Sequence, residues 1–200
     1  MKEYFALAVA LIWFFGHVFY LRQIIRKNIF PTLSTWIIFS VATGLNMASY
    51  LVASNKDLVS GSIIITDALV CFLIVVAVAI FTYSGLRFKP FEKYYLISAM
   101  GIVVFWAMTG NAFVANLLVQ ALIVVGYAPT IQNLIYSTKN PETYVTWSIS
   151  LGAAILSLYP IIANGNLLAS IYSIRAIIMI SFVIYLMLRI KRKNIIHVAV

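Results

Sequence analysis

The sequence predicts an all-α membrane protein with seven transmembrane helices, in a 3+1+3 arrangement of two parallel three-helix repeats joined by one helix. Three observations support this prediction. Apolar residues make up 64% of the 200-residue chain, charged residues only 10%, and the mean hydropathy is +1.02, which is far from a soluble globular composition. Apolar runs long enough to cross a hydrocarbon layer of about 30 Å recur along the chain. Finally, a segment that begins at Gly16 is repeated from Gly126.

The apolar runs are interpreted as helices in chain order. Continuous runs favour helices over a β-barrel, whose strands would show short alternating segments. The first run begins beside Lys2 and Glu3 and has no small-residue cleavage site, so we expect it to remain as a helix and not to be removed as a signal peptide. The third run contains the only cysteine, Cys71, which excludes an internal disulfide. The seven runs are residues 4–21, 33–53, 61–83, 94–110, 112–136, 143–163 and 167–189.

The fifth and sixth runs each contain a proline, at Pro129 and Pro160. A proline inside a helix lacks the backbone donor and permits a bend. Both prolines are therefore candidate gate hinges, and a fixed kink without motion is the alternative.

The repeat divides the chain into two similar halves. The copies read GHVFYLRQIIRKNIFPTLSTW from Gly16 and GYAPTIQNLIYSTKNPETYVTW from Gly126, and they lie at the junctions of runs one and two and of runs five and six. Because a single run without a counterpart separates the two triplets, both triplets should enter the membrane from the same side. We therefore expect a first three-helix repeat at 1–92, a linker helix at 93–111, and a second repeat with a basic cytoplasmic tail at 112–200.

The distribution of positive charge predicts the orientation. Of the 14 Lys and Arg residues, Lys2 and Lys56 lie at one end of the runs, Arg175 lies within the last run, and the other 11 follow the first, third, fifth and seventh runs. This bias predicts an outside N-terminus and a cytoplasmic C-terminus. The net charge of +9 is thus interpreted as a membrane signal and not as a sign of nucleic-acid binding. The short connections favour a prokaryotic plasma membrane.

The helix plan, the charge bias and the repeated junction together resemble the SWEET and PQ-loop transporter superfamily. The second copy is similar to the PQ-loop segment, with Pro129 in the family's proline position, whereas Thr130 stands where the family usually has Gln. The resemblance covers nearly the whole chain. It implies passage of a small polar solute, such as a sugar or an amino-acid-like molecule, by alternating access, with or without coupling to protons.

The resemblance also suggests where the solute would bind. In sugar carriers of this superfamily, Asn residues on helices 3 and 7 and aromatic residues from helices 2 and 6 line a pocket near the middle of the membrane. The corresponding places here hold Asp67, the stretch from Tyr172 to Arg175, Tyr50 and Tyr159. In relatives that carry amino acids, a membrane-embedded acidic residue takes part in proton coupling, and Asp67 would suit that role.

Asp67 and Arg175 are also singled out by their charge. They are the acidic and basic residues that lie within the predicted spans away from the span ends. An ionised side chain at a helix centre costs roughly 2.5–3.5 kcal/mol, so such a residue normally faces the bundle interior and has a partner. Two interpretations stay open: a permanent salt bridge between Asp67 and Arg175 that locks the triplets together, or binding of the solute, with Asp67 as a proton carrier.

Uncharged polar residues within the spans could bind the solute or bond to a neighbouring helix, each bond then being worth about 0.6 kcal/mol. Aromatic residues near the cytoplasmic ends could close an inner gate or belong to the aromatic belt at the membrane interface. His17 could have a substrate-binding or gating role, or be an interfacial or packed residue. The candidates for solute binding are Asn46, Gln120, Ser173, Ser170 and Thr66, and those for the inner gate are Tyr20, Trp36 and Trp147.

Other function classes fit the sequence less well. No His, Cys, Asp and Glu cluster has metal-ligand spacing, no cofactor is indicated, and no set of catalytic groups suggests an enzyme. A retinal protein would need a Lys in the last span. The alternative that stays open is a non-transporting receptor or sorting protein of the same fold. The expected partners are a small polar solute, the lipid bilayer and protons, and the sequence leaves open whether a homo-oligomer forms.

Overall fold

The computed structural model of the protein describes residues 1–27, 33–81, 90–136, 140 and 142–198, with side chains described except at 34–35, 129, 133 and 192–198. These residues form helices and no strand. Residues 28–32 in the polar link of the first repeated segment, and 137–139 and 141 in that of the second, lie outside the described residues. The helices are α1 (Lys2–Ile25), α2 (Leu33–Ala53), α3 (Ser62–Phe81), α4 (Pro90–Thr109), α5 (Ala112–Gly126), α6 (Ala128–Tyr136), α7 (Tyr144–Asn164) and α8 (Leu167–Val198).

Seven helical segments of the described chain are long and apolar enough to cross a membrane, with α5 and α6 together forming one of them. The predicted helical spans are therefore confirmed as helices. Many of their large apolar side chains point away from the protein interior, for example Leu69, Phe72 and Ile80 on α3. A helix that is apolar on all sides suits a lipid environment, where its outer face needs no polar residues. These features identify the chain as compatible with an integral membrane protein.

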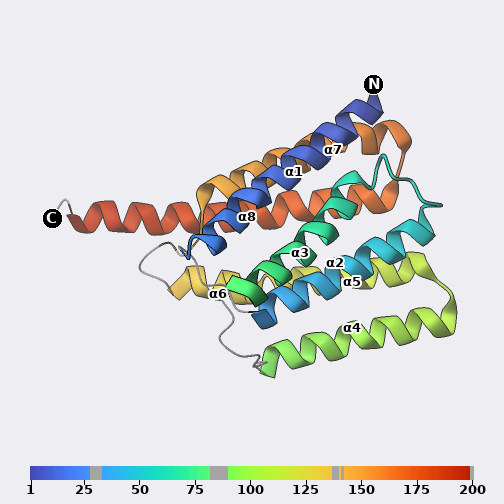
Figure 1. Ribbon diagram of the computed structural model, residues 1–200, viewed down its shortest axis with the longest axis horizontal. Coiled ribbons are helices and arrows are strands. Elements are labelled where there is room, and N and C mark those ends of the chain that lie inside the picture. Colours follow the sequence, from blue (N-terminus) through green and yellow to red (C-terminus); the bar gives the residue numbers. More distant parts are fainter. Residues whose placement is uncertain (28–32, 82–89, 137–139, 141, 199–200) are drawn as a thin grey trace.

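The helices pack in a definite order (Figure 1). Helix α3 contacts both α1 and α2, and α8 contacts α7, α5 and α6. Contacts between α1 and α7 and between α2 and α5 join these two groups, while α4 packs against α5 and α2 at the edge of the bundle. Gly16 lets α1 approach α7 closely, because a Cβ atom at this position would lie 2.7 Å from a methyl carbon of Ile149.

The N-terminus and the connections α2–α3, α4–α5 and α7–α8 lie at one end of the bundle, which we call the N-terminal end (Figure 1). The C-terminal part of α8 projects beyond the helices at the opposite end, which we call the C-terminal end. This placement is consistent with the seven predicted spans, because successive spans that cross a membrane must run in opposite directions.

The two prolines differ in their effect on the helices. The fifth span is interrupted at Tyr127, between α5 and α6, and Pro129 lies in the first turn of α6, where the missing backbone donor has no helical partner to lose. The side chain of Pro129 is outside the described residues. Pro160 is buried within a continuous α7 and does not end that helix. The local bend that a proline permits is compatible with a helix that continues, so Pro160 stays a candidate hinge with a fixed kink as the alternative.

Candidate functional site

Asp67 on α3 contacts side chains of its own helix and of α8. The hydroxyl of Tyr172 donates a hydrogen bond of 2.7 Å to Asp67 Oδ2, and the Cys71 thiol lies 3.9 Å from Asp67 Oδ1. His17 on α1 lies within electrostatic range of the carboxylate, and its Nδ1 is 2.8 Å from the carbonyl oxygen of Trp13. Among the described residues, the Asp67 carboxylate thus accepts one strong hydrogen bond, and its second oxygen has a weak sulfur contact.

Arg175 lies one helical turn from Tyr172 on α8. Its guanidinium carbon is 4.7 Å from the centroid of the Tyr172 ring, a distance typical of a cation–π contact. Its Nε donates a hydrogen bond of 2.8 Å to Gln120 Oε1 on α5. Among the described residues, the only ion pair joins the N-terminal ammonium of Met1 to Glu3. Asp67 and Arg175 therefore form no salt bridge, because the phenol of Tyr172 contacts both of them.

Amide side chains continue the chain of contacts from α5 to α2. Gln120 Nε2 donates to Asn46 Oδ1 at 2.7 Å, and Asn116 Nδ2 donates to the same oxygen at 2.9 Å and to Ser49 Oγ at 3.0 Å. Asn46 Nδ2 and Asn116 Oδ1 are buried and have no hydrogen-bond partner in the described part of the chain. Buried polar atoms without a partner are rare in folded proteins, so this donor and this acceptor retain unused hydrogen-bonding capacity.

We call this set of contacts the central network. It contains Asp67, Tyr172, Arg175, Gln120, Asn46, Asn116 and Ser49, and it joins helices α2, α3, α5 and α8. The structure thus brings together five residues that the sequence singled out, namely Asp67, Tyr172, Arg175, Asn46 and Gln120. Sequence reasoning missed Asn116 and Ser49. Their spacing from Gln120 and Asn46, four and three residues along a helix, was the available signal, because such residues share a helix face.

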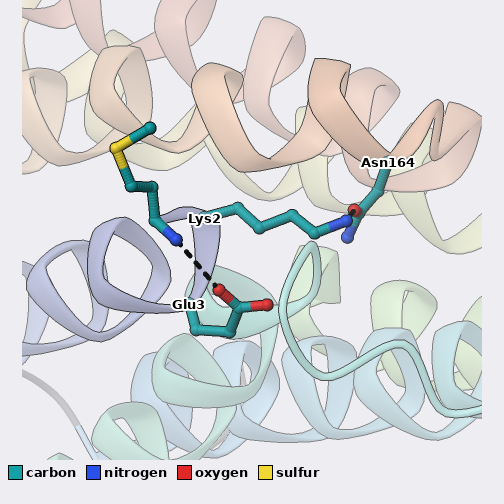
Figure 2. A network of polar contacts seen from close by, with 4 residues as sticks. Lys2, Glu3 and Asn164 are labelled. Atoms are coloured by element: carbon teal, nitrogen blue, oxygen red, sulfur yellow. Dashed lines mark hydrogen bonds and ion pairs between the residues drawn. The ribbon is translucent and has the colours of Figure 1, made fainter.

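A second polar cluster, the end network, lies at the N-terminal end of the bundle. Lys2 Nζ donates a hydrogen bond of 2.6 Å to Asn164 Oδ1 at the end of α7, and Figure 2 shows this side chain reaching across from α1. Asn164 Nδ2 in turn donates to Ser60 Oγ in the α2–α3 connection at 2.9 Å. These bonds connect α1, α7 and the α2–α3 connection.

Asn166, just before α8, completes the end network. Its Nδ2 donates to Tyr50 Oη at 3.0 Å and to Asp57 Oδ2 at 2.8 Å, and its Oδ1 accepts a bond of 3.1 Å from the backbone amide of Ala169. The Tyr50 hydroxyl donates to the backbone carbonyl of Asp57 at 3.0 Å. Tyr50, predicted to bind the solute, therefore belongs to the end network.

The charge of Asp57 is stabilised where it lies. Partial burial alone would raise the pKa of the Asp57 carboxyl, but hydrogen bonds from Ser60, Asn166 and the backbone of Val59 outweigh that effect and hold the pKa below its ordinary value. The end network therefore contains an ionised carboxylate at neutral pH.

Toward the C-terminal end, an aromatic chain crosses the bundle. Tyr20 on α1 contacts Trp36 on α2 with ring centroids 5.3 Å apart, and Trp36 contacts Phe39 at 5.9 Å. Phe39 then contacts Tyr127 at 6.4 Å, and Tyr127 contacts Trp147 on α7 at 6.2 Å. The three predicted gate aromatics, Tyr20, Trp36 and Trp147, thus belong to one chain of ring contacts that Phe39 and Tyr127 complete.

Glu142 anchors the last ring of the aromatic chain. The indole Nε1 of Trp147 donates a hydrogen bond of 3.0 Å to Glu142 Oε2. Burial raises the pKa of Glu142, and the bond from Trp147 offsets only part of that shift.

The other predicted site residues lie apart from the central network. Ser173 is buried and its hydroxyl lies 2.8 Å from that of Ser157, so this pair joins α8 to α7. Tyr159 is 46% exposed and its ring contacts that of Phe5. Thr66 and Ser170 donate to backbone carbonyls four residues earlier, at Ser62 and Asn166. These contacts fit interhelical or local bonding roles.

The described residues contain no group of three or more His, Cys, Asp and Glu side chains that could hold a metal ion. In comparisons with known proteins, no family model matches the chain, and neither the curated proteins nor the solved structures contain a significant match.

Proposed function

We propose that the chain is a membrane transporter that moves a small polar solute, such as a sugar or an amino-acid-like molecule, by alternating access between two three-helix bundles. The observation that carries this proposal is the position of the central network between the end network and the aromatic chain. The end network joins helices at one end of the bundle, and the aromatic chain joins helices toward the other. A polar centre between two separable sets of contacts is the arrangement that alternating access requires.

The packing order supports the 3+1+3 arrangement that the proposal assumes. Helix α3 contacts α1 and α2, and α8 in the same way contacts α5–α6 and α7. The contact between α1 and α7 likewise has its counterpart in the contact between α2 and α5. Exchanging the halves therefore maps these contacts onto one another. Together with the repeated segment and the bias of positive charge, this pattern favours parallel repeats with the N-terminus outside.

Within this proposal, Asp67 binds the solute or carries a proton. An ionised carboxylate within a membrane span costs free energy, and a carboxylate that is kept there usually has a functional role. The titratable and charged groups around it are His17, Cys71, Tyr127, Tyr172 and Arg175. Any proton that Asp67 takes up would change its bond with Tyr172, because a protonated carboxyl can itself donate.

The test is exchange of labelled solutes into proteoliposomes, with sugars, amino acids and nucleosides as the panel. We expect at least one class to exchange and Asp67→Asn to abolish the exchange or its pH dependence. Glu3→Gln, which removes an exposed carboxylate outside the central network, should leave both unchanged. Uptake by Asp67→Asn at the wild-type rate, with the wild-type pH dependence, would contradict the role of Asp67. Binding of a solute without exchange would instead favour a receptor.

A further inference from the structure

We propose that the central network binds a zwitterionic solute, an α-amino acid or close analogue, with its ammonium group at Asp67 and its carboxylate at Arg175. This inference rests on the proposed solute site and names its ligand class. It starts from an unusual feature of the network: a partly buried acid and a partly buried base contact the same phenol, one at its hydroxyl and one at its ring face, and do not form a direct ion pair.

Both charged side chains keep capacity for a ligand. Asp67 Oδ2 accepts the bond from Tyr172, whereas Oδ1 has only the weak contact with the Cys71 thiol at 3.9 Å. An ammonium group is a strong partner for such an oxygen. Arg175 uses Nε for Gln120 and also contacts the Tyr127 hydroxyl. A guanidinium has more N–H donors than these two contacts use, so it keeps donors for a carboxylate.

The geometry fits a ligand with two charges close together. The Tyr172 ring contacts the guanidinium with its face and the carboxylate with its hydroxyl, so the two charges are separated by about the width of one ring. An α-amino acid carries its ammonium and carboxylate on adjacent carbons and can therefore contact both. It would insert beside Tyr172 without requiring either charged side chain to leave its present partner.

Charge balance selects against other ligand classes. A neutral sugar would bring no opposite charge to Asp67 or Arg175, a simple anion would be repelled by Asp67, and a simple cation would be repelled by Arg175. Each mismatch desolvates a charge without compensation, which gives strong discrimination. The unpartnered amide atoms Asn46 Nδ2 and Asn116 Oδ1 add one donor and one acceptor, which suit a polar side chain on the amino acid.

The test uses the purified full-length chain in detergent and matched ligands. Each proteinogenic L-amino acid is compared with its decarboxylated amine and with the acid that lacks its amino group, and glucose and sucrose serve as neutral controls. We expect at least one amino acid to raise the thermal unfolding midpoint and to bind in calorimetry, with the matched amine and acid at least tenfold weaker. No stabilisation or binding by any amino acid, or equal binding of the amine or the acid, would overturn the proposal.

Two substitutions then separate the two ends of the ligand. Asp67→Asn should weaken amino-acid binding by about 10- to 150-fold and reduce the preference over the amino-free acid, because the lost bond involves charged groups. Arg175→Gln should weaken it by a similar factor and reduce the preference over the amine, and Arg175→Lys should restore part of the affinity. Ser157→Ala, which removes a buried interhelical bond outside the central network, should bind as the wild type does. Unchanged affinity in both charge variants would contradict the assignment.

Tyr172→Phe guards against variants that do not fold. It retains both charges and removes only the hydroxyl bond to Asp67, so the preference for zwitterions should persist, and its loss would contradict the assigned geometry. Exchange in proteoliposomes separates this inference from the proposed function. Amino-acid binding without exchange would leave the zwitterion site standing and refute transport, whereas exchange of a sugar without amino-acid binding would refute the zwitterion site and leave transport standing.

Discussion

Replacing Asn166 by Ala should open the N-terminal end of the bundle while leaving the rest of the fold intact. The Asn166 side chain makes three bonds: to Tyr50 at 3.0 Å, to Asp57 at 2.8 Å and to the backbone amide of Ala169 at 3.1 Å. The first two join the start of α8 to α2 and the α2–α3 connection. The third caps the first turn of α8 and joins no other helix.

The three bonds contribute differently to opening and to unfolding. Losing the helix cap costs about 1 kcal/mol, but it does so in the open and closed states alike, so it affects only the free energy of unfolding. A neutral bond to Tyr50 contributes about 0.5–1.5 kcal/mol. A bond to a carboxylate is usually stronger, but Asp57 is only partly buried and solvent screens its charge. We therefore assign about 1 kcal/mol to the bond between Asn166 and Asp57.

Opening should therefore become easier by about 1.5–2.5 kcal/mol, which is about 10- to 60-fold in the equilibrium between closed and open states. The free energy of unfolding should fall by about 2.5–3.5 kcal/mol, because the cap is then included. The difference between the two quantities is a specific consequence of the geometry around Asn166.

The chain carries its own reporter for this equilibrium. Cys71 is the only cysteine, is 5% exposed, and lies beside Asp67 in the bundle. The assay measures the rate at which a membrane-impermeant thiol reagent, added outside intact cells, modifies Cys71. Asn166→Ala should raise this rate by about the same factor as the opening equilibrium, 10- to 60-fold. Equilibrium unfolding in mixed micelles gives the stability in parallel.

Asn111→Ala is the matched control. Asn111 caps α5 at the same end of the bundle, where its Oδ1 accepts from Val114 N at 3.1 Å, and this bond joins no second helix. The control should lower the free energy of unfolding by about 1 kcal/mol and leave the Cys71 rate unchanged. If Asn166→Ala lowers the free energy of unfolding, but the reagent modifies Cys71 no faster in this variant than in Asn111→Ala, the end network is not a gate.

Three further predictions concern other parts of the bundle. Burial raises the pKa of Glu142, so folding favours the protonated form of this side chain. The free energy of unfolding should therefore fall as the pH rises from the ordinary pKa of Glu through the raised pKa. Glu142→Gln should remove this pH dependence of the free energy of unfolding, and an unchanged dependence would contradict the prediction. Gly61→Ala should lower the free energy of unfolding by about 1–3 kcal/mol, because a Cβ atom would lie 2.9 Å from a backbone carbonyl oxygen of the α2–α3 connection. A Cβ atom at Gly101 would meet nothing within 4 Å, so Gly101→Ala should raise the free energy of unfolding by up to about 1 kcal/mol. Equal unfolding midpoints of the two variants would contradict this prediction. Phe39→Ala should break the aromatic chain at its centre, so a thiol reagent that enters from the C-terminal end should modify Cys71 faster. Phe72→Ala, at a 59% exposed position, should leave this rate unchanged. Equal rates in the two variants would argue for a purely structural role of the rings.

The sequence predicted the helices, and it singled out part of the central network, for a local reason. Length and apolar content of a run are properties of consecutive residues, so the spans could be predicted without knowing the packing. Charged and amide residues are costly in lipid and gather inside the bundle, which is why Asp67, Arg175, Asn46 and Gln120 meet as members of one network.

Which atoms meet could not be predicted from the sequence. The salt bridge between Asp67 and Arg175, one of the two interpretations that the sequence left open, is absent, and Tyr172, one turn before Arg175, contacts both side chains. Tyr159 was placed with the solute site by resemblance, yet it faces outward and contacts Phe5. When apolar residues surround a helix on all sides, no sequence pattern fixes the rotation of that helix about its axis.

The sequence by itself determined that this chain forms seven apolar helical spans, that its halves share a repeated segment, and that a few polar residues are buried within the spans. Only the tertiary structure decided that those residues divide into a central network, an end network and an aromatic chain. The physical reason is that hydropathy adds up along the chain, whereas hydrogen bonds and ring contacts depend on the rotation and spacing of helices. These are set by side-chain packing between segments that lie far apart in sequence.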